Sequence, residues 1–118
     1  MSKFTIYHNP RCSKSRQTLA ILEERGITPD IRLYLEDVPD ETELHELISK
    51  LGINPRDLLR KGEEAYKRLG LAATDKDDAQ IIAAMLSEPK LIERPIVVKG
   101  SKAVLGRPPE NVLELVQG

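Results

Sequence analysis

Cysteine is almost absent from this sequence, since Cys12 is the only one among the 118 residues. Secreted domains of this size more often hold several cysteines in disulfides, and Cys12 has no partner within its own chain. No apolar run approaches the roughly 20 residues that a membrane span needs, and the N-terminus lacks the apolar segment of a signal peptide. These absences lead us to expect a cytoplasmic protein with no membrane segment.

An excess of charge of either sign is also lacking. Lys and Arg number 18 against 19 Asp and Glu, which gives a formal net charge of −1. Such a balance gives neither nucleic acid nor anionic lipid a global attraction, so we expect neither as a partner. Hydrophobic residues make up 40% and charged residues 31%, as in ordinary folded domains. The length suits one hydrophobic core, so we expect a single domain over residues 1–118. We also expect a monomer.

Apolar periodicity and turn signals predict a strand, a helix, a strand, three helices, two strands and a final helix. The expected elements lie near residues 4–7, 15–26, 30–35, 40–52, 54–62, 74–89, 96–98, 103–105 and 108–116. The third inserted helix is expected to open at Thr74 or Asp75, and the last helix at Pro108 or Pro109. The fold class is therefore α/β, with a four-stranded mixed sheet and a helical insertion, βαβ-ααα-ββα. This order resembles the thioredoxin and glutaredoxin arrangement, in which a reactive cysteine lies where the first strand meets the first helix.

Short turn motifs set several of these boundaries. Asn9-Pro10 ends the first strand, and Gly26 ends the first helix. Asp40 with Glu43 is typical of a capping box at a helix N-terminus. Gly100-Ser101 suits a two-residue type II′ turn with glycine at its first central position, so the last two strands should form a β-hairpin.

Cys12 lies at or just before the N-terminus of the first helix in this scheme. A thiol reacts as its thiolate, and an unperturbed cysteine with a pKa of about 8.5 is mostly protonated at neutral pH. Unpaired backbone N–H groups at a helix N-terminus favour negative charge, and Arg11, Lys14 and Arg16 add positive charge nearby. The Ser15 hydroxyl could donate a hydrogen bond to the thiolate, since residues i and i+3 share a helix face. This CxxS motif indicates an activated thiolate.

The same residues also have plain structural interpretations. A free cysteine is commonly a small buried hydrophobe. Lys14 and Arg16 could form a solvated helix face, and His8 could be a satisfied histidine at the end of the first strand. Residue types alone leave both interpretations open.

A resemblance to a known family covers essentially the whole chain. The run HNPRCSKSR, from His8 to Arg16, resembles the active-site loop of the glutaredoxin-coupled, ArsC-type arsenate reductases in its HNPxC form. Further segments resemble the family in the same order along the chain: Tyr34-Leu35-Glu36, Leu58-Leu59-Arg60-Lys61, Tyr66, Leu69-Gly70-Leu71, Arg94-Pro95-Ile96-Val97-Val98 and Gly106-Arg107-Pro108.

The resemblance assigns roles to the residues around the thiol. It implies that Cys12 is the catalytic nucleophile that attacks arsenate. His8 and Ser15 would be further catalytic residues, with the histidine helping to keep the thiol ionised. Pro95 would be the structural cis proline that faces the active site in thioredoxin-like folds.

The resemblance also implies an oxyanion site. Three arginines, Arg60, Arg94 and Arg107, would bind arsenate, whose oxygens suit bidentate guanidinium forks. One departure from the better-known members is Ser13-Lys14, which stands where they carry Gly-Thr. The Lys14 charge could favour oxyanion binding or indicate a different acidic substrate, and we include it among the expected substrate-binding residues.

The implied reaction uses glutathione as co-substrate and glutaredoxin as protein partner, with no bound cofactor and no metal. Cys12 would form a thio-arsenate intermediate, which glutathione and glutaredoxin would resolve to arsenite. The composition gives an independent reason for external thiols, because a chain with one cysteine cannot resolve its intermediate by an internal disulfide.

Two alternatives remain. One is a glutathione-dependent thiol oxidoreductase of the same fold with another substrate, against which the three arginines argue. The other is a non-enzymatic relative of the Spx type, a transcription regulator that binds RNA polymerase. Such regulators carry a CxxC switch, and Ser15 stands at the position of its second cysteine.

Overall fold

The computed structural model describes residues 4–73 and 76–116 of the chain. It divides into two compact units. The sheet unit comprises Met1–Asp37 and Arg94–Gly118, and the helical unit comprises Val38–Glu93. The helical unit corresponds to the insertion expected from the sequence. The expectation that residues 1–118 act as one domain stays a prediction.

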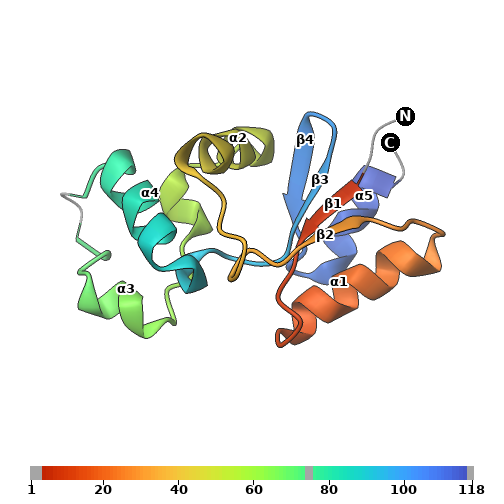
Figure 1. Cartoon of the computed structure of the whole chain (residues 1–118), viewed down its shortest axis with the longest axis horizontal. Coiled ribbons are helices and arrows are strands. Elements are labelled where there is room, and N and C mark those ends of the chain that lie inside the picture. Colours follow the sequence, from red (N-terminus) through yellow and green to blue (C-terminus); the bar gives the residue numbers. More distant parts are fainter. Residues whose placement is uncertain (1–3, 74–75, 117–118) are drawn as a thin grey trace. The chain divides into compact units, whose positions relative to one another are not determined.

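A four-stranded mixed sheet forms the centre of the sheet unit (Figure 1). Its strands are β1 (Phe4–Tyr7), β2 (Asp30–Arg32), β3 (Ile96–Lys99) and β4 (Lys102–Leu105), in the order β2-β1-β3-β4. β1 pairs with β2 in parallel and with β3 in antiparallel fashion, and β3 pairs with β4 in antiparallel fashion. The predicted α/β class with a mixed sheet is confirmed.

Three helical segments join the sheet to form the core of this unit. They are α1 (Ser13–Glu24), the 3-10 helix η3 (Pro109–Val112) and α5 (Leu113–Val116), and α1 lies against η3. Their apolar side chains meet those of β1 and β3 in one buried cluster, which contains Ile6, Leu22, Val97, Val112 and Leu115. Burying each of these side chains stabilises the fold by roughly 1.5–3 kcal/mol, so this cluster fixes α1 on the sheet.

The β3–β4 hairpin closes through the two residues that the sequence indicated. Gly100 has φ +61, and no residue other than glycine has a positive φ in the described part of the chain. A positive φ at the first central residue alone fits the type II′ pattern. The resulting register sets Lys99 opposite Lys102 and Ile96 opposite Leu105.

The helical unit contains three α-helices and two 3-10 turns among its described residues. They are α2 (Glu41–Leu51), η1 (Pro55–Leu58), α3 (Glu64–Arg68), α4 (Asp78–Ser87) and η2 (Pro89–Leu91). α4 contacts α2, η1 and η2. The buried side chains of these segments form a second apolar interior, which includes Leu44, Leu47, Ile48, Leu58, Ile81, Ile82, Met85 and Leu91.

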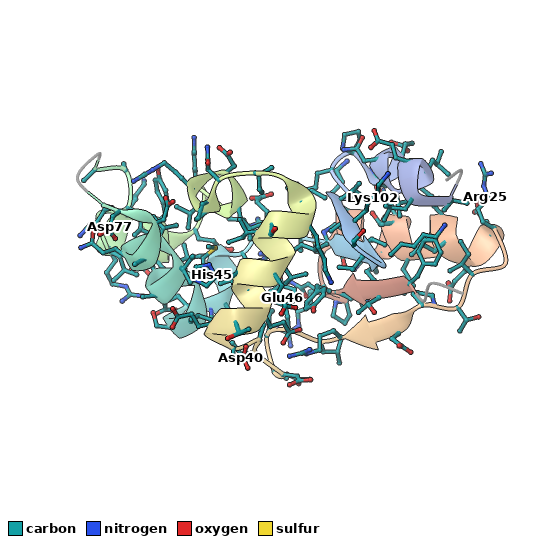
Figure 2. The ribbon with its side chains drawn as sticks, turned by 90° about the horizontal axis from the view of Figure 1, so that it is seen from above. Arg25, Asp40, His45, Glu46, Asp77 and Lys102 are labelled. Atoms are coloured by element: carbon teal, nitrogen blue, oxygen red, sulfur yellow. The ribbon has the colours of Figure 1, made fainter. Side chains whose placement is uncertain are left out.

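Side-chain caps fix where the longer helices of this unit begin (Figure 2). Asp40 accepts a hydrogen bond from the Glu43 N–H at 2.8 Å, as its motif predicted, and α2 ends at Gly52 with φ +69. Asp77 and Gln80 form a reciprocal capping box at the start of α4. The predicted opening of this helix at residue 74 or 75 lies outside the described residues. In the described part of the chain, no helix is long and apolar enough to cross a membrane.

Three elements differ from those predicted. The helix expected over residues 54–62 is wrong, because the helical turn stops at Leu58 and the chain then forms an isolated antiparallel bridge between Leu59 and Ile92. α3 was not expected. The second strand ends at Arg32 rather than near residue 35, because the chain turns back so that the Asp37 N–H donates to Leu33 O at 2.8 Å.

Candidate active site

Cys12 is the N-cap residue of α1 and follows a tight turn after β1. Its backbone is extended, with φ −94 and ψ 123, and its N–H donates to Asn9 O at 3.0 Å. Pro10 occupies the second position of this turn, where its fixed φ suits the geometry. An N-cap side chain faces the unpaired N–H groups of the first helical turn. The half-buried thiol of Cys12 stands at this position.

The pKa of Cys12 is shifted downwards by its surroundings. Burial on its own raises the pKa of the thiol. The backbone N–H groups of Ser15 and Lys14 and the charges of Arg94 and Arg107 lower it by more, so the net pKa lies below the ordinary value. The structure thus favours the activated thiolate over the inert buried cysteine.

The first prediction concerns this thiolate. The rate of Cys12 alkylation by iodoacetamide should rise with pH through a midpoint below that of free cysteine, since only the thiolate reacts and its pKa is lowered. Because the chain has one cysteine, the whole signal comes from this site. Free cysteine measured in parallel gives the reference midpoint. A protein midpoint at or above that of free cysteine would contradict the assignment.

His8 and Ser15 form a buried polar pair beside the thiol. His8 Nδ1 lies 2.6 Å from Ser15 Oγ, and Ser15 Oγ also accepts the Asn9 N–H at 3.0 Å. Burial, followed by the charge of Arg16, lowers the pKa of His8, which favours the neutral imidazole near pH 7. The Ser15 hydroxyl therefore bonds to His8 and Asn9, while its backbone N–H acts on the thiolate.

Arg94 and Arg107 come together because of the hairpin register. When the β3–β4 pairing is continued two residues beyond Ile96 and Leu105, Arg94 lies opposite Arg107. The Arg107 Nη1 group donates to Arg94 O at 3.3 Å. Arg94 is buried, with 7% of its surface exposed, and both guanidinium charges act on Cys12. The peptide bond between Arg94 and Pro95 is cis, and so is the one that follows Arg107.

Gly106 brings the segment before Arg107 into close contact with α1. Its N–H donates to Pro95 O at 2.9 Å, and its carbonyl accepts from Thr18 Oγ1 at 3.4 Å. A Cβ atom at this position would lie 2.5 Å from Thr18 Oγ1 and 2.8 Å from Pro95 Cγ. Thr18 is fully buried and Pro95 is a rigid ring, so neither can move aside easily. Only glycine fits here without displacing the chain.

The second prediction follows from this contact. Gly106→Ala should lower the free energy of unfolding by about 1–3 kcal/mol, because the added methyl group overpacks a buried contact. Urea denaturation followed by circular dichroism measures the change. Gly62→Ala is the matched control, because a Cβ at Gly62 meets nothing within 4 Å. Equal stabilities of the Gly106→Ala variant and the wild type would contradict the close packing.

The remaining predicted site residues lie in different surroundings. Lys14 is exposed in the first turn of α1, where its backbone N–H acts on the thiolate. Arg60 belongs to the helical unit, where its N–H donates to Leu91 O at 2.7 Å and its Nε lies 3.5 Å from Glu63 Oε1. The sheet unit therefore brings Arg94 and Arg107 to Cys12, whereas the role of Arg60 beside the thiol stays a prediction.

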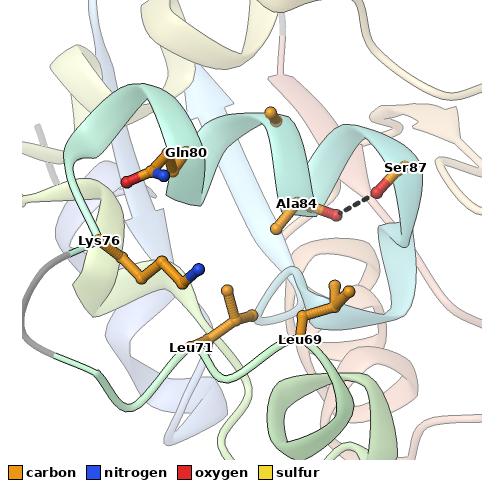
Figure 3. Close-up of a pocket in the computed structure, with 7 residues that line it drawn as sticks. Leu69, Leu71, Lys76, Gln80, Ala84 and Ser87 are labelled. Atoms are coloured by element: carbon orange, nitrogen blue, oxygen red, sulfur yellow. Dashed lines mark hydrogen bonds between the residues drawn. The ribbon is translucent and has the colours of Figure 1, made fainter.

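A separate pocket lies within the helical unit (Figure 3). It encloses about 390 Å³ and is lined by Leu69, Leu71, Lys76, Gln80, Ala83, Ala84 and Ser87. The Ser87 hydroxyl donates to Ala84 O at 3.1 Å, so it is already used within α4. None of the predicted site residues lines this pocket. Across residues 4–73 and 76–116, no three His, Cys, Asp or Glu side chains are grouped to hold a metal ion.

The chain matches known proteins along almost its whole length. The ArsC family model matches residues 7–115. The Escherichia coli K12 protein YfgD, described as uncharacterized, is 53% identical over 112 residues, which cover 94% of each chain. An arsenate reductase from Haemophilus influenzae is 50% identical over 94% of this chain and 97% of the relative. The solved structure of an arsenate reductase from Vibrio cholerae has a TM-score of 0.93 at 52% identity, covering 96% of this chain and 97% of that one.

The sheet order and the lone thiol at the N-terminus of α1 define a thiol protein with a thioredoxin-like α/β fold. Within that class the family match is specific. The chain belongs to the ArsC family, as its active-site loop and arginine motifs indicated.

Proposed function

We propose that this chain is an arsenate reductase, which reduces arsenate to arsenite through Cys12. The observation that carries the proposal is a half-buried thiol at the N-cap of α1, on which the charges of the buried Arg94 and of Arg107 act. A nucleophile and cations that attract an oxyanion are thereby combined in one place. The names of the Haemophilus influenzae and Vibrio cholerae relatives support arsenate as the substrate.

The first step is a substitution at arsenic. The Cys12 thiolate attacks the arsenic atom, so that an S–As bond forms and an As–O bond breaks. The departing oxygen leaves as hydroxide and takes a proton to become water. Arg94, Arg107 and Arg60 would bind the remaining oxygens and stabilise the charge that develops on them.

The second stage is the reduction. Conversion of arsenate to arsenite takes two electrons, and Cys12 is the only thiol of the chain. We infer that two external thiols supply the electron pair, glutathione first and glutaredoxin second, and that their sulfurs end joined in a mixed disulfide. Water then attacks the arsenic, the S–As bond breaks with its electron pair returning to sulfur, and arsenite leaves as the Cys12 thiolate is restored. The chain itself binds no cofactor in this scheme.

The thiol chemistry also indicates the cellular compartment in which the reaction takes place. Glutathione and reduced thiols are maintained in the cytoplasm, so we place the reaction there. We also propose that the protein acts as a monomer. Among the described residues, Ile31, Leu33 and Val38 are the only large hydrophobic side chains that are exposed, which is little for a permanent interface.

A coupled assay tests the proposal. The purified protein is mixed with arsenate, glutathione, glutaredoxin, glutathione reductase and NADPH, and both NADPH oxidation and arsenite are measured. We expect turnover that requires every component and that fails when thioredoxin replaces glutaredoxin. Turnover with a glutathione mixed disulfide but not with arsenate would favour the general thiol oxidoreductase. Inactivity together with recovery of RNA polymerase from cell extract would favour the Spx-type alternative.

A further inference from the structure

One residue of the active-site loop closes the turn between β1 and α1. We propose that Asn9 is a positioning residue, whose side chain and backbone together hold Cys12 at the N-cap of α1. From the sequence, Asn9 was expected only to end the first strand, together with Pro10. The structure shows a polar side chain in a buried residue, 7% exposed, and three hydrogen bonds to its neighbours.

Two of these bonds account for the N–H groups of the turn that follow Asn9. The Arg11 N–H donates to Asn9 Oδ1 at 3.0 Å, and the Cys12 N–H donates to Asn9 O at 3.0 Å. Pro10, which lies between, has no N–H. The backbone of the residue before the thiol and the backbone of the thiol residue itself are thus both held by Asn9. An asparagine side chain that accepts from residue i+2 is the Asx turn, which substitutes for a backbone turn.

The third bond joins the turn to the helix. The Asn9 N–H donates to Ser15 Oγ at 3.0 Å, and that oxygen lies 2.6 Å from His8 Nδ1. Asn9 is therefore bonded to the chain both before and after the Cys12 side chain, in the turn and in the first turn of α1. Asn9 is thus hydrogen-bonded to Arg11, Cys12 and Ser15 at once.

This arrangement determines which groups the thiolate faces. The Cys12 N–H is used by Asn9 O, so the favourable backbone contacts come from Lys14 and Ser15. Their effect depends on the direction of the Cα–Cβ bond of Cys12, which the turn sets. Without Oδ1, the Arg11 N–H loses its partner and the turn can adopt other conformations. The sulfur would then spend less time facing the N–H groups of α1, and its pKa would rise.

The decisive experiment compares Asn9→Ala with Asn9→Ser. Alanine removes the side-chain acceptor, whereas serine keeps a weaker one that can form the equivalent turn. We expect the midpoint of Cys12 alkylation to rise by about one pH unit in Asn9→Ala and by less in Asn9→Ser. For arsenate reduction, which rests on the proposed function, kcat/KM should fall about tenfold in Asn9→Ala and should partly recover in Asn9→Ser. The alkylation readout uses no substrate, so failure of the arsenate proposal would leave this test intact.

Asn54→Ala is the matched control. Asn54 also precedes a proline and caps a helical turn, η1, but it belongs to the helical unit. Only Asn9→Ala should shift the thiol midpoint. An unchanged midpoint in folded Asn9→Ala would overturn the proposal, and so would an equal shift in Asn54→Ala. If Asn9→Ala does not fold, a wild-type midpoint combined with reduced stability in Asn9→Ser would show a merely structural role.

Discussion

Cys12→Ser should abolish arsenate reduction and leave the protein at least as stable as the wild type. The hydroxyl of serine ionises far above neutral pH, so the substituted chain has no anionic nucleophile at this position. It also has no thiol at all, because Cys12 is the only cysteine. We expect a fall in kcat of at least about a thousandfold, to the level of the reaction without enzyme. Stability should not fall, because serine is among the best N-cap residues and Cys12 occupies that position.

The coupled assay measures the activity, and urea denaturation measures the stability. Arsenite formed by glutathione and glutaredoxin alone is subtracted as the background. The combination of lost activity with retained or increased stability separates a chemical role from a structural one. Residual arsenate reduction above the background would show that another group attacks arsenic. A marked loss of stability would show that the sulfur packs as a hydrophobe rather than serving as a nucleophile.

The proximity of Arg94 and Arg107 could have been predicted from the sequence, although the spacing of the arginines alone does not indicate it. Arg94 and Arg107 are 13 residues apart in the chain, and scattered arginines are usually surface cations. The Gly100-Ser101 turn, however, predicts a two-residue hairpin, and loop length fixes register. Continued by two residues, that register sets Arg94 opposite Arg107, and in the structure the Arg107 Nη1 group donates to Arg94 O. The pairing of these two arginines was therefore implicit in a turn that the sequence did indicate.

The helical unit was harder to predict because its boundaries depend on distant pairing. Proline after Asn54 is a good helix start, and the sequence pattern favoured a helix to residue 62. In the structure, the Glu93 N–H donates to Leu58 O and the Arg60 N–H donates to Leu91 O. These bonds join segments about thirty residues apart and end the helical turn. Local propensity carries no information about such partners, so the error lies where a non-local contact decides the backbone.

Asn9 and Gly106 show a second limit of prediction from a single sequence. Asparagine before proline and glycine near a strand end are both ordinary turn signals. Their importance comes from what surrounds them: three hydrogen bonds at Asn9, and Thr18 with Pro95 against Gly106. A sequence pattern gives the residue type, whereas the tertiary structure supplies these neighbours. Positioning residues are consequently harder to recognise from one sequence than the nucleophile that they serve.

Arg94→Ala should reduce kcat/KM for arsenate by about a hundredfold, because a buried guanidinium that stabilises transition-state charge is removed. The alkylation midpoint of Cys12 should also rise, since the Arg94 charge lowers its pKa. The backbone carbonyl of residue 94 remains in this variant, so the Arg107 side chain keeps its acceptor. The coupled assay and the alkylation profile measure the two effects separately.

Arg94→Lys separates charge from geometry. Lysine keeps the positive charge and lacks the planar fork that binds two oxygens. The thiol midpoint should therefore stay near the wild-type value, while kcat/KM for arsenate should still fall by at least about tenfold. Arg25→Ala is the control, because Arg25 is exposed at the opposite end of α1 (Figure 2), and it should change neither quantity. Normal turnover in Arg94→Ala would refute the oxyanion role. A kcat/KM fully retained in Arg94→Lys would show that Arg94 acts only through its charge, and that arsenate is held by other groups.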